Sequence, residues 1–194
     1  MVDRQVRTQF QMTLNLRMSE LETERLRLRV FRDSDLAGVA QWDEALRAEN
    51  FLEFCFRSYR EWGMGPWAME LKQSGAIAGN CSFCRIDYER ESGTLELCGE
   101  VNYYVAPPYR GRGLALEALQ AMLRFGFGDI KLTRIQGRCA PENVSSERVL
   151  EKAGLKFDRM IAGAEGLPEE RLYAISREEL LRVMSSSPSG CDSC

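Results

Sequence analysis

Histidine is missing from the chain altogether, and long apolar runs are missing as well. Without histidine the protein can have no histidine-dependent catalytic triad, and it lacks a side chain that commonly joins cysteine in zinc sites. No apolar run approaches the roughly 20 residues that a membrane-spanning helix needs. The first residues, MVDRQVRTQF, lack the apolar core of a secretory signal. These absences predict a cytoplasmic protein with no membrane segment.

Cysteine is present but sparse, and its seven residues are too scattered for a disulfide framework. Two Cys-x-x-Cys spacings occur, at Cys81 and Cys84 and at Cys191 and Cys194. The first pair lies in a predicted strand, where an i, i+3 spacing sends the side chains to opposite faces. The second ends a Ser/Pro/Gly-rich tail that has nothing apolar to bury. We therefore predict no structural metal.

The composition is that of one ordinary globular domain. The 194 residues are 44% hydrophobic and 28% charged, which suffices for one well-buried core. The net charge is −3 and the basic residues are dispersed, which argues against a nucleic-acid partner. We predict a flexible N-terminal extension at 1–20, a single domain at 21–184 and a disordered tail at 185–194.

The N-terminal half predicts one strand, two helices and then three successive strands. From Arg25 to Val30, leucine or valine alternates with arginine, as in a half-buried strand. Asp33 begins a short helix, and residues 44–62 carry aromatic side chains at helical spacing. Strands are then expected at 67–71, 77–88 and 94–105. Their short connections indicate an antiparallel meander.

The C-terminal half alternates helices and strands. One helix begins after Gly113, and further elements are expected at 134–139, 145–153, 157–161 and 171–175. The strand-helix-strand order should bring parallel pairing into the same sheet. The strand at 171–175 should pair back on the one at 157–161. The fold class predicted by this count is α/β, with a mixed sheet.

The stretch from Gly99 to Ile130 is the most informative, because a helix follows directly after a loop rich in glycine and arginine. The free N–H groups and positive dipole of such a helix start favour an anion. Gly111 and Gly113 allow several N–H groups to converge on one group of oxygens, and Arg110 and Arg112 add charge suited to phosphate. The alternative is a plain turn with solvated arginines.

Two common phosphate-binding signatures do not fit this loop. It has no Gly-x-x-x-x-Gly-Lys-Ser/Thr, and no complete Gly-x-Gly-x-x-Gly followed by an acidic residue. The run from Arg110 to Ala115, RGRGLA, instead resembles the pyrophosphate loop of the GNAT acetyltransferases, Arg/Gln-x-x-Gly-x-Gly/Ala. The wider phrasing resembles the RimJ/RimL type, in LETERLRLR at 21–29, GEVNYYV at 99–105, and NVSS through EKAGL at 143–155.

This resemblance implies a GNAT-like sheet of six or seven strands, splayed near its middle, with helices on both faces and acetyl-CoA as the acyl donor. The loop residues Arg110, Gly111, Arg112, Gly113, Leu114 and Ala115 would hold the pyrophosphate. A bulge near Tyr104 and Val105 would free strand N–H groups, and the N–H of Val105 would polarise the thioester carbonyl. Asn143 would contact the pantetheine arm.

The catalytic roles implied by the resemblance fall on Glu100 and Ser146. Glu100 is the candidate general base, and the alternative is a solvated or salt-bridged carboxylate with water chains carrying the proton. Ser146 is the candidate for protonating or hydrogen-bonding the departing thiolate, and the alternative is a residue in the first turn of a capped helix. Other candidate acids are Tyr104, Tyr109 and Tyr173.

The predicted activity is direct transfer of acetyl from acetyl-CoA to a primary amine, through a ternary complex, by a monomer or homodimer. The acceptor would be a protein N-terminus or a small-molecule amine. A noncatalytic acyl-CoA-binding module and a purely structural partner domain are the alternatives. The first of these alternatives would bind CoA without turnover, and the second would not bind it.

Overall fold

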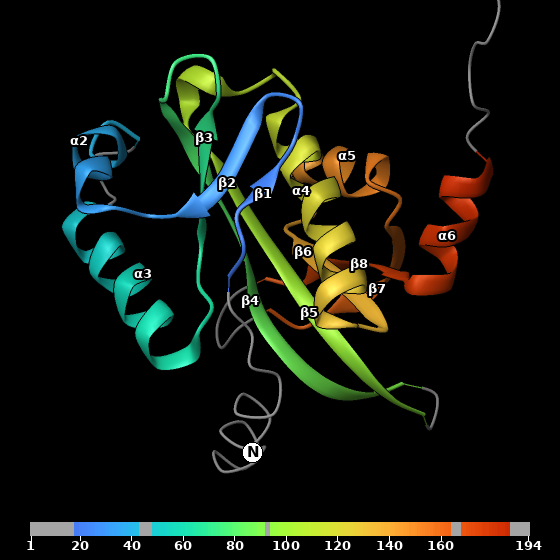
Figure 1. Ribbon diagram of the computed structural model, residues 1–194. Helices are drawn as coiled ribbons and strands as arrows, with labels where there is room; N and C mark the ends of the chain where they lie inside the picture. The colour runs from blue at the N-terminus through green and yellow to red at the C-terminus, as the bar shows by residue number, and fades with distance from the viewer. Residues whose placement is uncertain (1–17, 43–47, 92–93, 164–167, 187–194) are drawn as a thin grey trace, which may run out of the picture.

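The computed structural model describes residues 18–42, 48–91, 94–163 and 168–186. Its centre is an eight-stranded sheet with the order β1-β2-β3-β4-β5-β6-β8-β7 (Figure 1). The predicted mixed α/β class is confirmed, with one strand more than expected. The extra strand is β1 (Leu21–Glu22), which pairs with β2 (Leu26–Val30). A two-residue strand is too short to show an alternating pattern in the sequence.

The N-terminal half of the sheet is antiparallel, as predicted. The strands β2, β3 (Trp67–Leu71), β4 (Ile77–Glu91) and β5 (Thr94–Val105) pair in chain order. Between β2 and β3 come a 3₁₀ turn (Asp33–Asp35), α2 (Leu36–Val39) and α3 (Ala48–Trp62). Residues 44–47 of the predicted second helix lie outside the described residues.

The C-terminal half contains the predicted parallel pairing. Helix α4 (Leu114–Phe125) continues into a π-helical turn (Gly126–Ile130) and leads to β6 (Arg134–Cys139), which pairs parallel to β5. Helix α5 (Val144–Lys152) leads to β7 (Lys156–Ile161). Strand β8 (Glu170–Ser176) pairs back on β7 as predicted, and it lies between β7 and β6.

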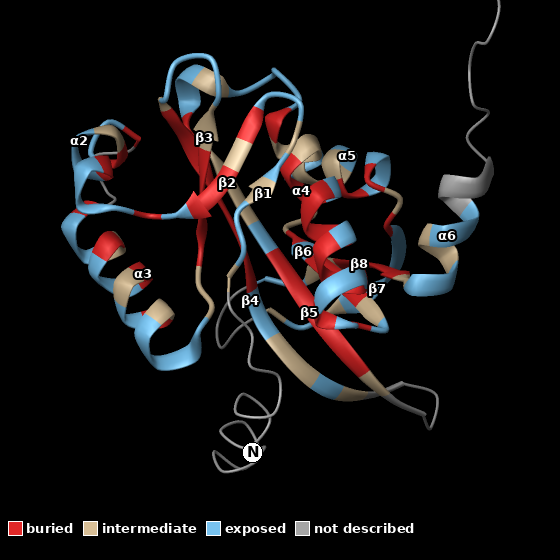
Figure 2. Cartoon of the chain, in the orientation of Figure 1, coloured by how far each residue is buried: buried red, intermediate tan, exposed pale blue. Residues whose placement is uncertain are grey.

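Helices cover both faces of the sheet, and each face has its own core (Figure 2). On one face, α4 and α5 pack their apolar sides on the sheet, for example through Leu119 and Leu150. On the other face, α2 and α3 pack around Trp42 and Leu52. Because strand side chains alternate, neighbours such as Trp67 and Ala68 belong to different cores.

The sheet is splayed in its middle. Strands β5 and β6 pair only from Cys98 and Arg134 to Val101 and Gly137, although β5 continues to Val105 and β6 to Cys139. Beyond these four residue pairs the two strands separate. The expected splay is therefore present, at the end of β5 that leads into the glycine-rich loop.

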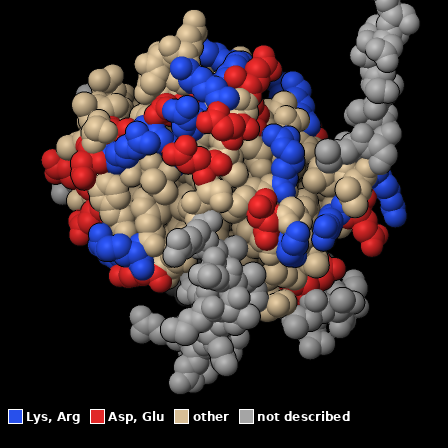
Figure 3. All heavy atoms as spheres, viewed as in Figure 1, with Lys and Arg blue, Asp and Glu red and all other residues tan. Residues whose placement is uncertain are grey.

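The predicted terminal segments fall mostly outside the described residues, which begin at Met18 and end at Ser186. The last described element, α6 (Arg177–Ser186), enters the first two residues of the predicted tail. In the described part of the chain, no helix is long and apolar enough to cross a membrane. There, too, no group of three or more His, Cys, Asp or Glu side chains is placed to hold a metal ion. Acidic and basic side chains are interspersed on the face seen in Figure 3.

Candidate functional site

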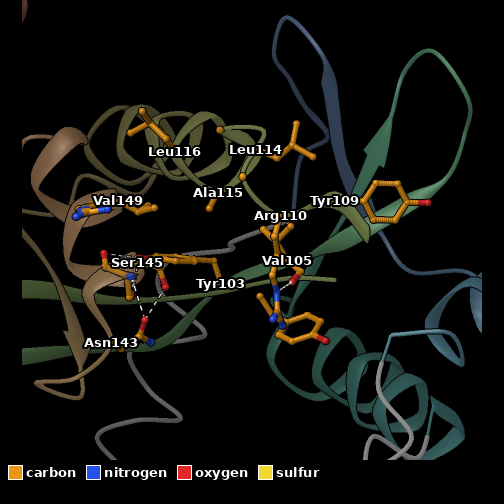
Figure 4. Close-up of a pocket in the computed structure, with 15 residues that line it drawn as sticks. Tyr103, Val105, Tyr109, Arg110, Leu114, Ala115, Leu116, Asn143, Ser145 and Val149 are labelled. Atoms are coloured by element: carbon orange, nitrogen blue, oxygen red, sulfur yellow. Dashed lines mark hydrogen bonds between the residues drawn. The ribbon is translucent and has the colours of Figure 1, made fainter. Parts of the chain in front are cut away.

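A cleft of about 540 Å³ lies where the sheet is splayed (Figure 4). One wall, the strand-loop wall, consists of cleft-lining residues between Tyr103 and Leu116, from the end of β5 to the start of α4. The other, the α5 wall, consists of cleft-lining residues between Asn143 and Val149. The cleft thus joins an open strand edge to two helix starts.

The strand edge exposes main-chain amides to the gap. The N–H of Ala106 donates to the carbonyl of Ala78 on the β4 side, whereas the carbonyl of Leu97 accepts from Thr133 on the β6 side. Successive residues of a strand turn their N–H groups to opposite edges. The N–H groups of Tyr103 and Val105 therefore point away from β4, into the gap that β6 has left.

The predicted bulge near Tyr104 and Val105 is wrong. Both residues pair in regular register with β4, opposite Asn80 and Gly79. The irregularity lies in β4, between Phe83 and Arg85. The amides at the end of β5 are freed by the departure of β6 instead. After Ala106, the two prolines begin a 3₁₀ turn (Pro107–Tyr109), and the ladder ends there because proline has no N–H to donate.

The glycine-rich loop has the backbone that the sequence predicts. Gly111 and Gly113 have φ of 73° and 75°, the left-handed region that glycine adopts without a steric penalty. Gly113 is also the N-cap of α4, and no side chain caps it. The first N–H groups of α4 thus remain available to an anion at the end of the cleft.

The loop is held from outside the cleft by Arg25. Its guanidinium donates to the carbonyl of Arg112 at 2.8 Å and, through Nε, to Glu117 at 2.6 Å. Thr23 Oγ1 donates to the same carboxylate at 2.6 Å. Burial raises the pKa of Glu117, but these hydrogen bonds and the Arg25 charge outweigh it, so its pKa lies below the usual value.

The two loop arginines separate. Arg110 lines the cleft, donates through Nε to the carbonyl of Val105 at 2.9 Å and lies over the Tyr104 ring. Arg112 stacks on Tyr109 instead, with its guanidinium carbon 5.6 Å from the ring centre. Gly111, Gly113, Leu114 and Ala115 line the cleft with Arg110. The structure therefore brings together five of the six predicted loop residues.

The α5 wall is organised by Asn143, which caps the helix. Its Oδ1 accepts from the N–H of Ser146 at 3.1 Å and from the hydroxyl of Ser145 at 2.8 Å. This is the capped helix start expected as the alternative role of this segment, and it places Asn143 and Ser146 together at the cleft. The cap uses only the amide oxygen of Asn143, so its NH₂ group can serve a ligand.

Ser146 meets a residue that the sequence reasoning missed. The Tyr103 hydroxyl lies 2.8 Å from Ser146 Oγ and 3.2 Å from its carbonyl oxygen. Burial raises the pKa of Tyr103 to about 12. The strand alternation offers a signal, because Tyr103 shares a sheet face with Val105. Leu116 also lines the cleft and was not predicted. Three further overlooked residues, Ser145, Arg148 and Val149, have the i, i+3, i+4 spacing of one helix face.

The other candidate acids are less well placed. The Tyr104 hydroxyl is turned to the carbonyl of Trp42 at 3.2 Å, on the α2 side. Tyr173 is 1% exposed and donates to Glu147 at 2.6 Å, and burial raises its pKa. Tyr109 lines the cleft, at the loop end (Figure 4).

Glu100 lies near the gap but on the other side of the sheet. By alternation its side chain shares a face with Tyr104, opposite α4. It is 6% exposed, accepts from Arg138 Nε at 2.9 Å, and lies 3.8 Å from Arg85. The structure thus separates Glu100 from Ser146, with the sheet between them.

Comparisons with known proteins agree on the family. A family profile described as "Acetyltransferase (GNAT) domain" matches residues 25–156. The uncharacterized N-acetyltransferase YnaD of Bacillus subtilis is 38% identical over 84 residues, which span 41% of this chain and 49% of that protein.

Solved structures share the fold. The GNAT-family acetyltransferase from Bacillus anthracis has a TM-score of 0.69 at 27% identity, with 82% of this chain and 99% of that chain covered. Mycobacterium smegmatis RimJ, in complex with CoA-disulfide, has a TM-score of 0.68 at 20% identity, with 86% and 94% covered. The chain belongs to the GNAT family of acetyltransferases, enzymes that use acetyl-CoA as acyl donor.

Proposed function

We propose that this protein transfers acetyl from acetyl-CoA directly to a primary amine in a ternary complex. One observation carries the proposal. The cleft joins free amides of a helix start, suited to phosphates, to free amides of a strand edge, suited to an extended amide-containing arm. A cleft with these two features side by side fits the two chemically different parts of CoA.

The donor lies along the strand-loop wall. The pyrophosphate binds the main-chain amides between Arg110 and Ala115, with the Arg110 guanidinium beside them. The pantetheine arm follows β5 and receives a hydrogen bond from the Asn143 NH₂ group. The N–H of Val105 donates to the thioester carbonyl, which stabilises the negative charge that develops on its oxygen. The side chain of Val105 has no chemical role.

The chemical roles fall to groups on opposite sides of the sheet. Ser146, in the cleft, donates a hydrogen bond to the departing sulfur. Glu100, on the opposite face, accepts a proton from the ammonium group of the acceptor, and the neutral amine that results attacks the thioester carbonyl, from which the CoA sulfur departs. Glu100 lies three residues before Tyr103, about 10 Å along the strand, so water must carry the proton between them. Orientation of both reactants side by side supplies a large part of the rate advantage.

The acceptor we propose is the α-amino group of a protein N-terminus, with small-molecule amines as the alternative. The RimJ/RimL-type phrasing of the sequence and the likeness to RimJ support this choice. A cytoplasmic location and a monomeric or homodimeric state remain predictions.

The test is a binding measurement followed by an activity measurement. Calorimetry should show CoA binding, and free thiol should appear when acetyl-CoA is mixed with a peptide that has a free N-terminus. A polyamine and an amino acid complete the panel. No CoA binding would reject the proposal, whereas binding without turnover on any amine would favour the noncatalytic module.

The role of Glu100 has its own test. Glu100→Gln should lower kcat by about 100-fold and shift its pH dependence, because the variant keeps the shape but cannot accept a proton. Glu96→Gln changes a carboxylate on the same strand face and is the matched control. Equal kcat values for the two variants would remove Glu100 from the mechanism.

A further inference from the structure

The hydroxyl of Tyr103 has two possible acceptors and one proton. Ser146 Oγ lies at 2.8 Å and the Ser146 carbonyl oxygen at 3.2 Å. A tyrosine hydroxyl can donate only once, so it either donates to Oγ or donates to the carbonyl and accepts from Oγ. The shorter distance belongs to Oγ. The choice decides where the single proton of Ser146 points.

In the first arrangement Ser146 Oγ accepts from Tyr103 and its own proton is free to point into the cleft. In the second, the Ser146 proton is used by Tyr103 and cannot reach a ligand. Both side chains line the cleft, and Tyr103 reaches toward the first turn of α5 (Figure 4). The cap holds that turn, because Asn143 accepts from the Ser146 N–H.

We propose that Tyr103 is a positioning residue, which donates to Ser146 Oγ and thereby aims the Ser146 proton at the sulfur of CoA. The inference rests on the proposed function, in which that sulfur lies beside Ser146. The Tyr103 hydroxyl then lies with that of Ser146 beside the departing sulfur, and the hydrogen bond between them links β5 to α5.

Tyr103 and Ser146 both act by hydrogen bonding, and neither transfers its proton to the sulfur. Burial raises the pKa of Tyr103 to about 12, whereas an ordinary thiol has a pKa of about 8.5. A full proton transfer from Tyr103 to a thiolate would therefore be unfavourable, because the pKa of the donor exceeds that of the acceptor by more than about three. The aliphatic hydroxyl of Ser146 is a weaker acid still, so it stabilises the thiolate by a hydrogen bond and keeps its proton. Tyr103 holds Ser146 in the orientation that donates this bond. Of the other polar groups nearby, Cys139 of β6 interacts with the Tyr103 hydroxyl and Arg148 lines the cleft.

The experiment measures the thiol pKa of bound CoA, which needs no acceptor. The thiolate is followed by its ultraviolet absorbance as pH rises, with the complex of desulfo-CoA as the blank. A hydrogen bond from Ser146 favours the thiolate, so the unchanged protein should lower the thiol pKa by about one unit relative to free CoA. Both Ser146→Ala and Tyr103→Phe should abolish most of this shift.

The double variant separates positioning from an independent contact. If Tyr103 acts through Ser146, adding Tyr103→Phe to Ser146→Ala changes the thiol pKa no further. Tyr173→Phe is the matched control, because it removes another hydroxyl that bonds to α5, through Glu147, outside the cleft. This control should keep the full shift.

The outcomes distinguish this inference from the proposed function. Absence of CoA binding in the unchanged protein would defeat both. CoA binding with an unshifted thiol, a full shift in Tyr103→Phe, or an equal loss in Tyr173→Phe would overturn the role of Tyr103 alone. An additional loss in the double variant would also overturn it.

Discussion

The two walls of the cleft offer a ligand different chemistry. The strand-loop wall offers mainly main-chain amides, from the edge of β5 and the uncapped start of α4. The α5 wall offers side chains, with Asn143 capping its own helix and Ser146 bonded to Tyr103. Backbone conformation thus controls the first wall, and individual side-chain atoms control the second. We expect substitutions in the glycine-rich loop to weaken CoA binding, and substitution of Ser146 to lower turnover.

The largest effect is expected from Gly113→Val. A β-branched residue is strained at φ of 75°, and relief of that strain would turn the helix-start amides away from the cleft. The Kd for CoA, measured by calorimetry, should rise by at least about 100-fold. Gly75→Val is the control, because Gly75 has φ of 72° in a turn between β3 and β4. Equal CoA affinity in both variants would contradict the main-chain description of this wall.

Ser146→Ala, on the α5 wall, should lower turnover and leave CoA binding almost unchanged. Loss of the hydrogen bond to the departing sulfur should lower kcat by about 100-fold, since one donor aimed at a developing negative charge typically contributes that much or more. The Kd for CoA should change by no more than about threefold, because the phosphates bind elsewhere. Steady-state kinetics and calorimetry together decide the matter. A parallel loss of affinity would show that the hydroxyl only helps to bind the donor.

Glu117→Gln should loosen the glycine-rich loop, because Glu117 holds Arg25, which donates to the loop carbonyl of Arg112. Removing the charge from hydrogen bonds with Thr23 and Arg25 should cost about 2 kcal/mol of unfolding free energy. The CoA affinity should fall by about tenfold as the loop loosens. Glu178→Gln is the control, because the side chain of Glu178 is 85% exposed. Equal free energies of unfolding for Glu117→Gln and Glu178→Gln would contradict the anchoring role of Glu117.

The same carboxylate predicts a pH dependence. The pKa of Glu117 is lowered in the folded protein, so its stabilising contribution is complete above the unfolded value of about 4.3 and is lost as pH falls through the folded value. The stability difference between the unchanged protein and Glu117→Gln should therefore be constant from pH 7 to about pH 5 and shrink below about pH 4. Denaturant titrations across this range measure it. A difference that persists in acid would contradict the assignment.

The smallest effects are expected at Asn143, where two substitutions separate its two roles. Asn143→Ala should cost about 1 kcal/mol of stability through the lost cap. Asn143→Asp keeps an oxygen for the cap but removes the NH₂ donor, so it should preserve stability and weaken CoA binding by a few fold. If Asn143→Asp binds CoA like the unchanged protein, Asn143 is only a cap.

The strand-loop wall was largely predictable because its determinants are local. The spacing of Gly111 and Gly113 and the prolines after Val105 specify backbone conformation within a few residues. The contact between Tyr103 and Ser146 joins residues 43 positions apart and depends on how far β6 leaves β5. The bulge was predicted in the wrong strand for a related reason. Its position depends on the register of β4 against β5, which the alternation of side chains along β5 does not reveal. The pairing of Glu100 with Arg138 likewise depends on neighbouring strands.

The short contact between β5 and β6 has a thermodynamic consequence. Four residue pairs join what are otherwise two smaller sheets, β1 to β5 and β6 to β8. A ligand that accepts hydrogen bonds from the free amides of Tyr103 and Val105 adds bonds in the gap that the folded protein alone lacks, so its binding favours the folded state. The protein should therefore unfold at a higher temperature with CoA present. Hydrogen exchange at these two amides should slow by the largest factor in the chain.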